Sequence, residues 1–253
     1  MIAMSKGKET PVFHTILRRW EVPTDAVLVV HSAITGLSQQ GFRAEGMIEA
    51  LINYLDKGTL LMPAMTWRTV TPSNPVFDEL NTPSHTGALT EVFRTRYATS
   101  RSLHPTHSVA GYGQAAKTLL ATHHIGDTPV PPTSPYALFR DYPAFILLLG
   151  VGLEMCTAIH HPEEVIAPEI YLKPIEEAEF YELHDRNGNI VKYTLRRHKK
   201  LNRDFPKFVP LLAAKNQILT GDINGVAWSI VRAGDLLREV FARLIERPNF
   251  NLA

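Results

Sequence analysis

A histidine and a glutamate three residues apart give the first chemical lead in this sequence. His160 and Glu163 stand in LLLGVGLEMCTAIHHPEE (residues 147–164), which opens as a continuous apolar run and ends in titratable residues. An imidazole can accept a proton near neutral pH, and a carboxylate on the same face of a helical turn can orient it. Open α/β sheets bind ligands just past the carboxyl ends of their strands, where this pair would lie. The spacing therefore indicates general-base catalysis, although two solvated residues at a helix start would show it as well.

The same segment is compatible with two other chemistries. His160, His161, Glu163 and Glu164 are all metal-ligand types and could serve a metal-dependent hydrolase. However, adjacent residues on a helix point about 100° apart, and the H-E-x-x-H motif is missing, so we expect no metal site. Cys156 precedes His160 by four residues, which would suit a thiol nucleophile and would equally suit a small buried residue.

Two further polar segments could bind a ligand. VVHSAITGL (residues 29–37) ends an apolar run in small and hydroxyl residues, and its backbone N–H groups, with Ser32 and Thr35, could hold a phosphate or an amide. It lacks the glycine spacing of dinucleotide and P-loop motifs, so an ordinary turn explains it too. RSLHPTHS (residues 101–108) concentrates arginine, histidine and serine residues, which could bind an anion or form a solvated loop.

A parallel sheet would bring these segments together. Apolar runs at residues 25–33, 59–64 and 144–152 predict buried strands, and the first two flank an amphipathic helix at residues 43–58. Such a strand–helix–strand unit predicts parallel pairing. Asn187-Gly188, between two alternating segments, predicts a hairpin, and the chain closes with a predicted amphipathic helix. The fold class is therefore α/β, with a hairpin-containing C-terminal portion that begins near residue 170.

Composition narrows the class of protein. The 253 residues, 45% hydrophobic and 20% charged, predict a soluble chain with one domain over residues 1–253. The net charge of +1 gives no reason to expect a nucleic-acid partner. Cys156 is the one cysteine, so a reducing, cytoplasmic location fits. We expect neither secretion nor a membrane span, because the sequence shows no cleavable leader and no long apolar stretch.

Seven segments, taken in order, resemble the aminoglycoside 3-N-acetyltransferase family. They are VVHSAITGL, KGTLLMPA, FDELNTPSHTGALTEVFR, RSLHPTHSVAGYG, TSPYALF, LLLGVG and TAIHHPEE, and the later GDINGVAWSIVRAGDLL is similar to that family as well. Each motif alone is loose, but their order over roughly residues 14–247 is specific. The resemblance implies a layered α/β/α sheet, unlike the common acetyltransferase fold. It also implies acetyl-CoA as co-substrate and transfer of its acetyl group to a small-molecule amine, which confers antibiotic resistance where that amine is an aminoglycoside.

The resemblance also assigns roles to particular residues. His160 takes the position of the family's catalytic histidine, and Glu163 and Thr157 accompany it. The segments that contact CoA fall on His31, Ser32, Ala33, Ile34 and Thr35, and on Arg101, Ser102, His104 and Ser108. We expect the amine to contact Thr66, Trp67, Glu164 and Asp204. Cys156 falls where many members have asparagine, which argues against a thiol nucleophile.

Three features depart from the family's pattern. Ala33 replaces a serine of the CoA-contacting segment, the stretch between TWRTVTPSN and FDELNTP lacks a longer insertion, and TLRRHKKLNRDF (residues 194–205) is basic where the family tends to be acidic. If that basic segment faced the pocket, it would favour an anionic amine such as a nucleotide-linked amino sugar; a solvated exit from the hairpin explains it equally. Four functions therefore stay open: an N-acetyltransferase with a non-aminoglycoside acceptor, a true aminoglycoside enzyme, a metal-dependent hydrolase and a non-catalytic CoA-binding module. A homodimer is possible as well.

Overall fold

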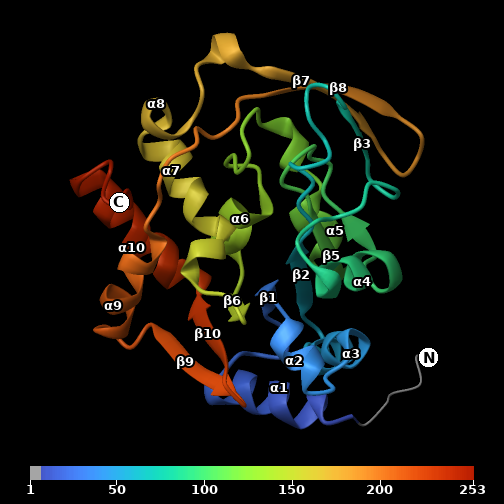
Figure 1. The fold of residues 1–253 in the computed structure, drawn as a ribbon, viewed down its shortest axis with the longest axis vertical. Helices are drawn as coiled ribbons and strands as arrows, with labels where there is room; N and C mark the ends of the chain where they lie inside the picture. The colour runs from blue at the N-terminus through green and yellow to red at the C-terminus, as the bar shows by residue number, and fades with distance from the viewer. Residues whose placement is uncertain (1–6) are drawn as a thin grey trace.

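A seven-stranded sheet forms the centre of the computed structural model, which describes residues 7–253 (Figure 1). The strand order is β4-β5-β2-β1-β6-β10-β9. β1, β2 and β6 run parallel, whereas β5 and β10 are antiparallel to their neighbours β2 and β6. The strands are β1 (Val27–Ser32), β2 (Thr59–Pro63), β4 (Ser100–Arg101), β5 (Val109–Gly113), β6 (Ala144–Leu149), β9 (Ile218–Ile223) and β10 (Val226–Arg232).

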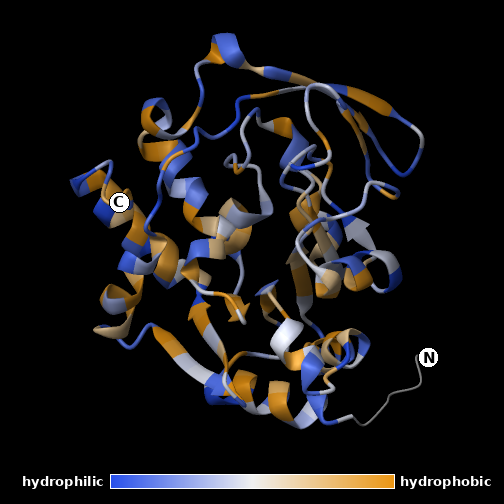
Figure 2. Cartoon of the chain, in the orientation of Figure 1, coloured by the Kyte–Doolittle hydropathy of each residue, from blue (hydrophilic) through white to orange (hydrophobic). Residues whose placement is uncertain are grey.

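Both faces of this sheet are covered by helices, which explains the continuous apolar runs of its central strands. Leu28 and Val30 of β1 pack into one apolar core, and Val27 and Val29 pack into another on the opposite face. The first core is closed by α1 (Glu9–Arg19), α2 (Thr35–Gln39), α3 (Ala44–Tyr54) and α4 (Ala88–Arg96). The second is closed by α5 (Ala116–Leu120), α6 (Pro135–Leu138), α9 (Phe208–Ala213) and α10 (Ala233–Glu246). Figure 2 shows apolar residues concentrated along the central strands. The predicted α/β/α layering is confirmed.

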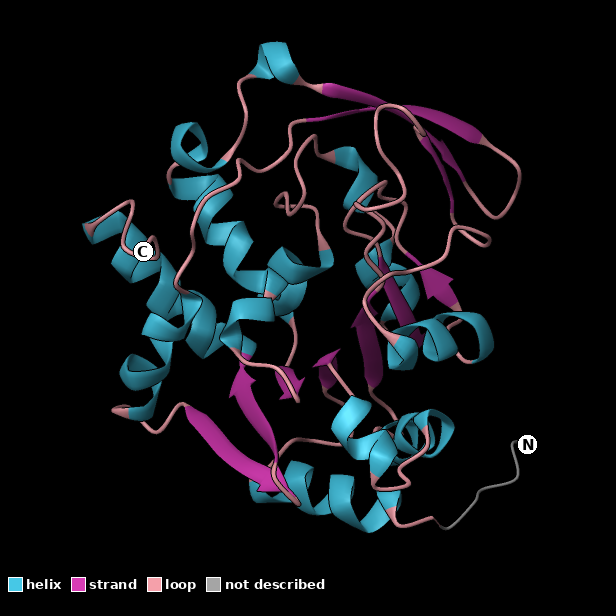
Figure 3. Cartoon of the chain, in the orientation of Figure 1, coloured by secondary structure: helices cyan, strands magenta, loops and turns pink. Residues whose placement is uncertain are grey.

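A small second sheet lies at the end of the molecule opposite α1 (Figure 1). It has the order β3-β7-β8, in which β7 and β8 pair antiparallel around the turn that contains Gly188, at φ +84°. Its own apolar cluster includes Val70, Phe77 and Tyr181. Loops connect it to the rest of the chain (Figure 3). The strands are β3 (Val76–Asp78), β7 (Glu179–His184) and β8 (Ile190–Leu195).

The remaining helices follow β6. α7 (His160–Ile166) and α8 (Pro168–Tyr171) lead from the carboxyl end of β6 towards the small sheet. None of the helices that residues 7–253 form is both long and apolar enough to cross a membrane.

Candidate active site

His160 and Glu163 meet at the start of α7. After β6, the chain bends at Gly150, where φ is +67° and an added Cβ would lie 2.3 Å from the carbonyl oxygen of Ala33, at the end of β1. A short 3₁₀ turn at Thr157–Ile159 then leads into α7, whose first residue is His160. His160 Nδ1 lies 2.6 Å from Glu163 Oε2, as the three-residue spacing on one helical face predicts. The carboxylate thus fixes the imidazole so that Nδ1 faces the protein interior.

A buried network holds Glu163 in its charged form. The Nε of Arg203 donates to both carboxylate oxygens, at 2.9 and 3.1 Å, and the side-chain amide of Asn251 donates to Oε1. Burial alone would raise the pKa of Glu163, but the adjacent His160 and Arg203 outweigh burial and lower the pKa below its ordinary value. Glu163 therefore stays ionised at neutral pH and can stabilise a proton on His160.

A second histidine–glutamate pair lies against the first. His198 Nε2 is 2.6 Å from Glu164 Oε1, and the His198 ring lies 4.4 Å from the His160 ring. Burial lowers the pKa of His198 well below its ordinary value and raises that of Glu164 to about 8, so the two groups share their protons at 2.6 Å. Phe205 contacts His160 edge-on at 5.3 Å between ring centroids. His160 is thus held by its carboxylate and by two neighbouring rings.

His160 borders a cavity of about 810 Å³ at the carboxyl ends of β1, β2 and β6. Its Nε2 forms no hydrogen bond within residues 7–253. His31 is buried, with 7% of its surface exposed, and its Nε2 also has no hydrogen-bond partner among residues 7–253. Burial lowers the pKa of His31 to about 4, so this ring is neutral. The predicted residues that line the cavity are His31, Ser32, Ala33, Ile34, Thr35, Trp67, Thr157 and His160.

The segment at residues 101–108 has a different place from the expected one. Arg101 is buried, and its guanidinium donates to Ser108 Oγ and to three backbone carbonyl oxygens, of Ala64, Glu79 and Thr82. The hydroxyl of Ser102 is 2.9 Å from His123, and His104 Nδ1 accepts two backbone N–H groups. Arg101, Ser102, His104 and Ser108 are not among the cavity-lining residues. They fasten the loops behind the cavity wall, and His107 alone from this segment lines it.

Replacing Arg101 by methionine tests whether Arg101 supports these loops or contacts CoA. We expect the melting temperature to fall by several degrees, because the change leaves the carbonyl oxygens of Glu79 and Thr82 without their donor and each such loss costs about 1–3 kcal/mol where the group is buried. The affinity for CoA should be unchanged in the protein that remains folded. Calorimetric unfolding and CoA titration check both points; an unaltered melting temperature with weakened CoA binding would restore Arg101 as a CoA ligand.

Three of the residues predicted to contact the amine substrate do not line the cavity. The hydroxyl of buried Thr66 donates to the carbonyl oxygen of Pro105 at 2.6 Å. Both carboxylate oxygens of Glu164 are taken up by Thr128, the Val130 N–H and His198. Asp204 lies 3.6 Å from Lys207 Nζ. Of the four residues predicted to contact the amine, Trp67 is the one that lines the cavity.

The described side chains do not form the arrangement that a metal site or a thiol nucleophile requires. His161 points away from His160, and its Nδ1 lies 3.1 Å from the Val130 carbonyl oxygen. In the described part of the chain, no group of three or more histidine, cysteine, aspartate or glutamate side chains is arranged to hold a metal ion. Cys156 is fully buried, and burial raises the pKa of its thiol to about 12. Among the described residues, the structure therefore forms neither the ligand set nor the reactive thiolate that these alternatives require.

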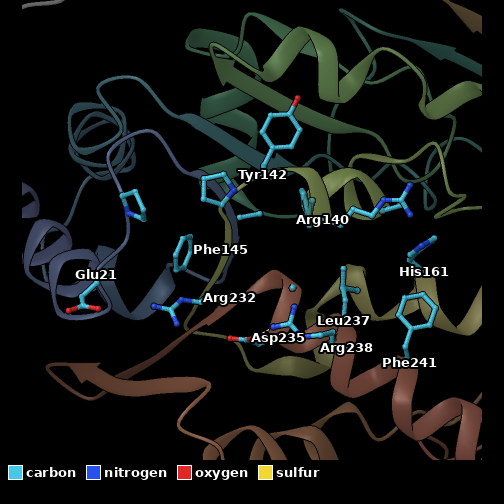
Figure 4. Close-up of a pocket in the computed structure, with 16 residues that line it drawn as sticks. Glu21, Arg140, Tyr142, Phe145, His161, Arg232, Asp235, Leu237, Arg238 and Phe241 are labelled. Atoms are coloured by element: carbon cyan, nitrogen blue, oxygen red, sulfur yellow. Dashed lines mark hydrogen bonds and ion pairs between the residues drawn. The ribbon is translucent and has the colours of Figure 1, made fainter.

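A second cavity lies at the other ends of the strands, near the start of β6 and of α10 (Figure 4). Its volume is about 580 Å³, and Phe145, His161, Arg232 and Phe241 are among the residues around it. The histidine–glutamate pair of the first cavity has no counterpart among the residues around this one. His161 Nδ1 has a backbone carbonyl oxygen as its partner, and Asp235 pairs with Arg238. The cavity beside His160 is therefore the candidate active site.

The residues that complete this site are distant in the sequence, and the sequence reading missed them. His198 and Arg203 belong to the basic segment after β8, and Asn251 follows α10. Arg196, Arg197 and Lys199 of that basic segment contact Lys173 O, Glu179 and Glu169 O, so they face other parts of the surface and do not line the cavity. A histidine and an arginine five residues apart in a basic run were the one signal available, and surface charge explained it equally well.

Comparisons with solved structures identify proteins that share this fold. Solved structures with the same fold include the aminoglycoside acetyltransferase AAC(3)-IVa apoenzyme, at a TM-score of 0.77 and 21% identity over 100% of this chain and 94% of that one. Another is AAC-IIIb in a binary complex with CoASH, at a TM-score of 0.76 and 20% identity over 94% and 96% of the two chains. Likeness at this identity establishes the fold.

The sequence establishes the family. The profile described as aminoglycoside 3-N-acetyltransferase matches residues 29–244, and the chain belongs to this family. Aminoglycoside N(3)-acetyltransferase VII from Streptomyces paromomycinus is 29% identical over 184 residues, which are 64% of this chain and 64% of that protein. The prophage-derived aminoglycoside N(3')-acetyltransferase-like protein YokD from Bacillus subtilis is 24% identical over 54% of this chain and 57% of its own length. The matches thus span less than two thirds of these relatives.

Proposed function

We propose that this protein is an N-acetyltransferase that moves the acetyl group of acetyl-CoA to a small-molecule amine. One observation carries the proposal: an imidazole oriented by a charged, buried carboxylate borders a cavity at the carboxyl ends of parallel strands. Family membership and the likeness to a CoASH-bound enzyme support it.

His160 acts as the general base in this proposal. Its Nε2 takes a proton from the ammonium group of the acceptor or from the amine as the amine attacks, and Glu163 stabilises the imidazolium that results. The amine adds to the thioester carbonyl carbon of acetyl-CoA, the C–S bond then breaks, and CoA leaves as a thiol that takes up the proton held by His160. Base assistance of this kind contributes about 10²–10⁴-fold to the rate, and holding two substrates together in one cavity contributes more.

The end of β1 and the start of α4 have the chemistry that acetyl-CoA requires. His31 lines the cavity with its Nε2 unpartnered within residues 7–253, and the hydroxyls of Ser32 and Thr35 can bind amide and carbonyl groups. Residues 87–90, which open α4, line the same cavity and present N–H groups that suit phosphates. The two segments adjoin, since an added Cβ on Gly87 would lie 3.8 Å from the Ser32 carbonyl oxygen.

Backbone N–H groups just after β1 are the candidates for stabilising the developing oxyanion. The N–H of Ala33 donates to the Leu149 carbonyl oxygen at 2.8 Å and is therefore occupied. The N–H groups of Ile34 and Thr35 lie at the start of α2, where a helix leaves its first donors free. We assign the stabilisation of the oxyanion to these two groups.

A thermal-shift titration with acetyl-CoA, with free CoA alongside, is the experiment that tests this function. Ligand at 100 times its dissociation constant should stabilise the fold by about 2.7 kcal/mol and raise the melting temperature measurably. Release of free thiol in the presence of amines then reports turnover. A protein that shows no saturable shift at millimolar acetyl-CoA is not an acetyl-CoA-dependent enzyme.

A further inference from the structure

The cavity beside His160 is poor in negative charge. Glu154 is the one acidic residue that lines it within residues 7–253, and its Oε1 accepts the Gly152 N–H at 2.7 Å. The next carboxyl groups are already engaged: Glu163 is paired with Arg203, and Glu164 with His198. A polycationic amine would therefore find one partly occupied carboxylate and no second one.

The cavity does carry a cationic side chain that has no ion-pair partner in the described part of the chain. Arg68 lines the cavity, and no carboxylate there lies within ion-pair distance of its guanidinium. The guanidinium carbon lies 5.0 Å from the centroid of the Trp67 ring, so the arginine rests against an aromatic face. Arg68 is exposed at the cavity, so its N–H donors are free to pair with an anion that binds there.

Trp67, Arg68 and His85 together form an aromatic and cationic rim. The His85 ring meets the Trp67 ring edge-on, at 4.5 Å between centroids, and neither nitrogen of His85 has a partner among the described residues. Burial and the nearby charge of Arg68 lower the pKa of His85, so the ring is neutral and can both donate and accept a hydrogen bond. Trp67 keeps 38% of its surface exposed, so part of the indole is accessible to a ligand.

We infer that the acceptor is an amine whose ring carries an anionic group, such as an amino sugar phosphate, and that Arg68 selects it. This inference rests on the proposed acetyl transfer. The ring would stack on Trp67 and the anion would pair with Arg68, while the amine reaches His160. Arg68 would repel a polycation, which gives specificity through like charge as well as attraction.

Thiol release from acetyl-CoA should be measured with glucosamine, glucosamine 6-phosphate and a polycationic aminoglycoside as acceptors. We expect the wild-type kcat/KM to be at least tenfold higher for the phosphate than for glucosamine, and lowest for the aminoglycoside. Arg68→Glu should lose that preference at least tenfold and gain activity on the aminoglycoside, while Arg68→Gln should lose the preference alone. Arg140→Glu is the matched control, because Arg140 is an exposed arginine beside the second cavity and should leave all three values unchanged.

Each contrary result has its own meaning. A wild-type enzyme that prefers the aminoglycoside overturns the charge inference and leaves the acetyl transfer standing. A rise in the KM for acetyl-CoA in Arg68→Gln, with acceptor preference unchanged, assigns Arg68 to a CoA phosphate and likewise overturns it. If CoA raises the melting temperature but no amine releases thiol, the proposed function itself fails, and the acceptor inference fails with it.

Discussion

His160→Asn is expected to lower kcat/KM by about 10²–10⁴-fold, the usual contribution of a general base, and to leave the fold intact. The loss follows from geometry: His160 is held by Glu163 at 2.6 Å and borders the cavity, and no other imidazole there has a carboxylate partner of this kind among the described residues. Steady-state kinetics, with the melting temperature and CoA affinity measured on the same preparation, check the result.

The neighbouring histidine supplies the matched control. His161→Asn makes the same chemical change one position along the helix, where the side chain points to the Val130 carbonyl oxygen. It should keep most of the activity. Rates close to wild type in His160→Asn, or an equal loss in both variants, would remove His160 from the chemistry and point to positioning of the substrates as the whole source of catalysis.

Glu163→Ala is expected to be the most destabilising change in the site. It leaves Arg203 without its carboxylate in a largely buried position, and removing one partner of a buried ion pair typically costs about 3–5 kcal/mol. It also deprives Asn251 of its acceptor and His160 of the group that orients it. We therefore expect both stability and turnover to fall, measured by chemical denaturation and by kinetics.

Glu163→Gln separates the two effects by its pH dependence. The pKa of Glu163 is lower in the folded protein than its ordinary value of 4.5, so its ionised form stabilises the fold above that pH and this contribution is lost as the pH falls through the folded pKa. Glutamine does not titrate. The difference in unfolding free energy between wild type and Glu163→Gln should therefore be largest near neutral pH and shrink in acid; a constant difference would show that the charge of Glu163 does not stabilise the fold.

The core of this fold follows from local sequence, because its strands are buried on both faces. A short, continuous apolar run such as residues 144–149 is typical of a strand buried on both faces. Its residues alternate between the two cores, as strand geometry requires. The pair His160 and Glu163 was predictable for the same reason, since three residues within one helix determine its geometry.

Contacts between distant segments could not be predicted in this way. Asn251 lies 88 residues from Glu163, and no local pattern indicates that its amide reaches that carboxylate. Arg101 shows the converse difficulty: a buried arginine that donates to backbone carbonyl oxygens and an arginine that binds an anion have the same letter and similar neighbours in the sequence. The distinction depends on burial, which the tertiary structure determines.

The small sheet supports the part of the cavity to which we assign the acceptor. The loop that carries Trp67 and Arg68 is fastened by Val70 to the apolar cluster of β3, β7 and β8, whereas His160 depends on β6, α7 and the segment after β8. Substitutions at Val70 or Phe77 in that small cluster can therefore shift the rim, and they reach His160 only through the segment that follows β8. Such a division lets an enzyme change the molecules it accepts by drift in a peripheral lobe, with its chemistry preserved.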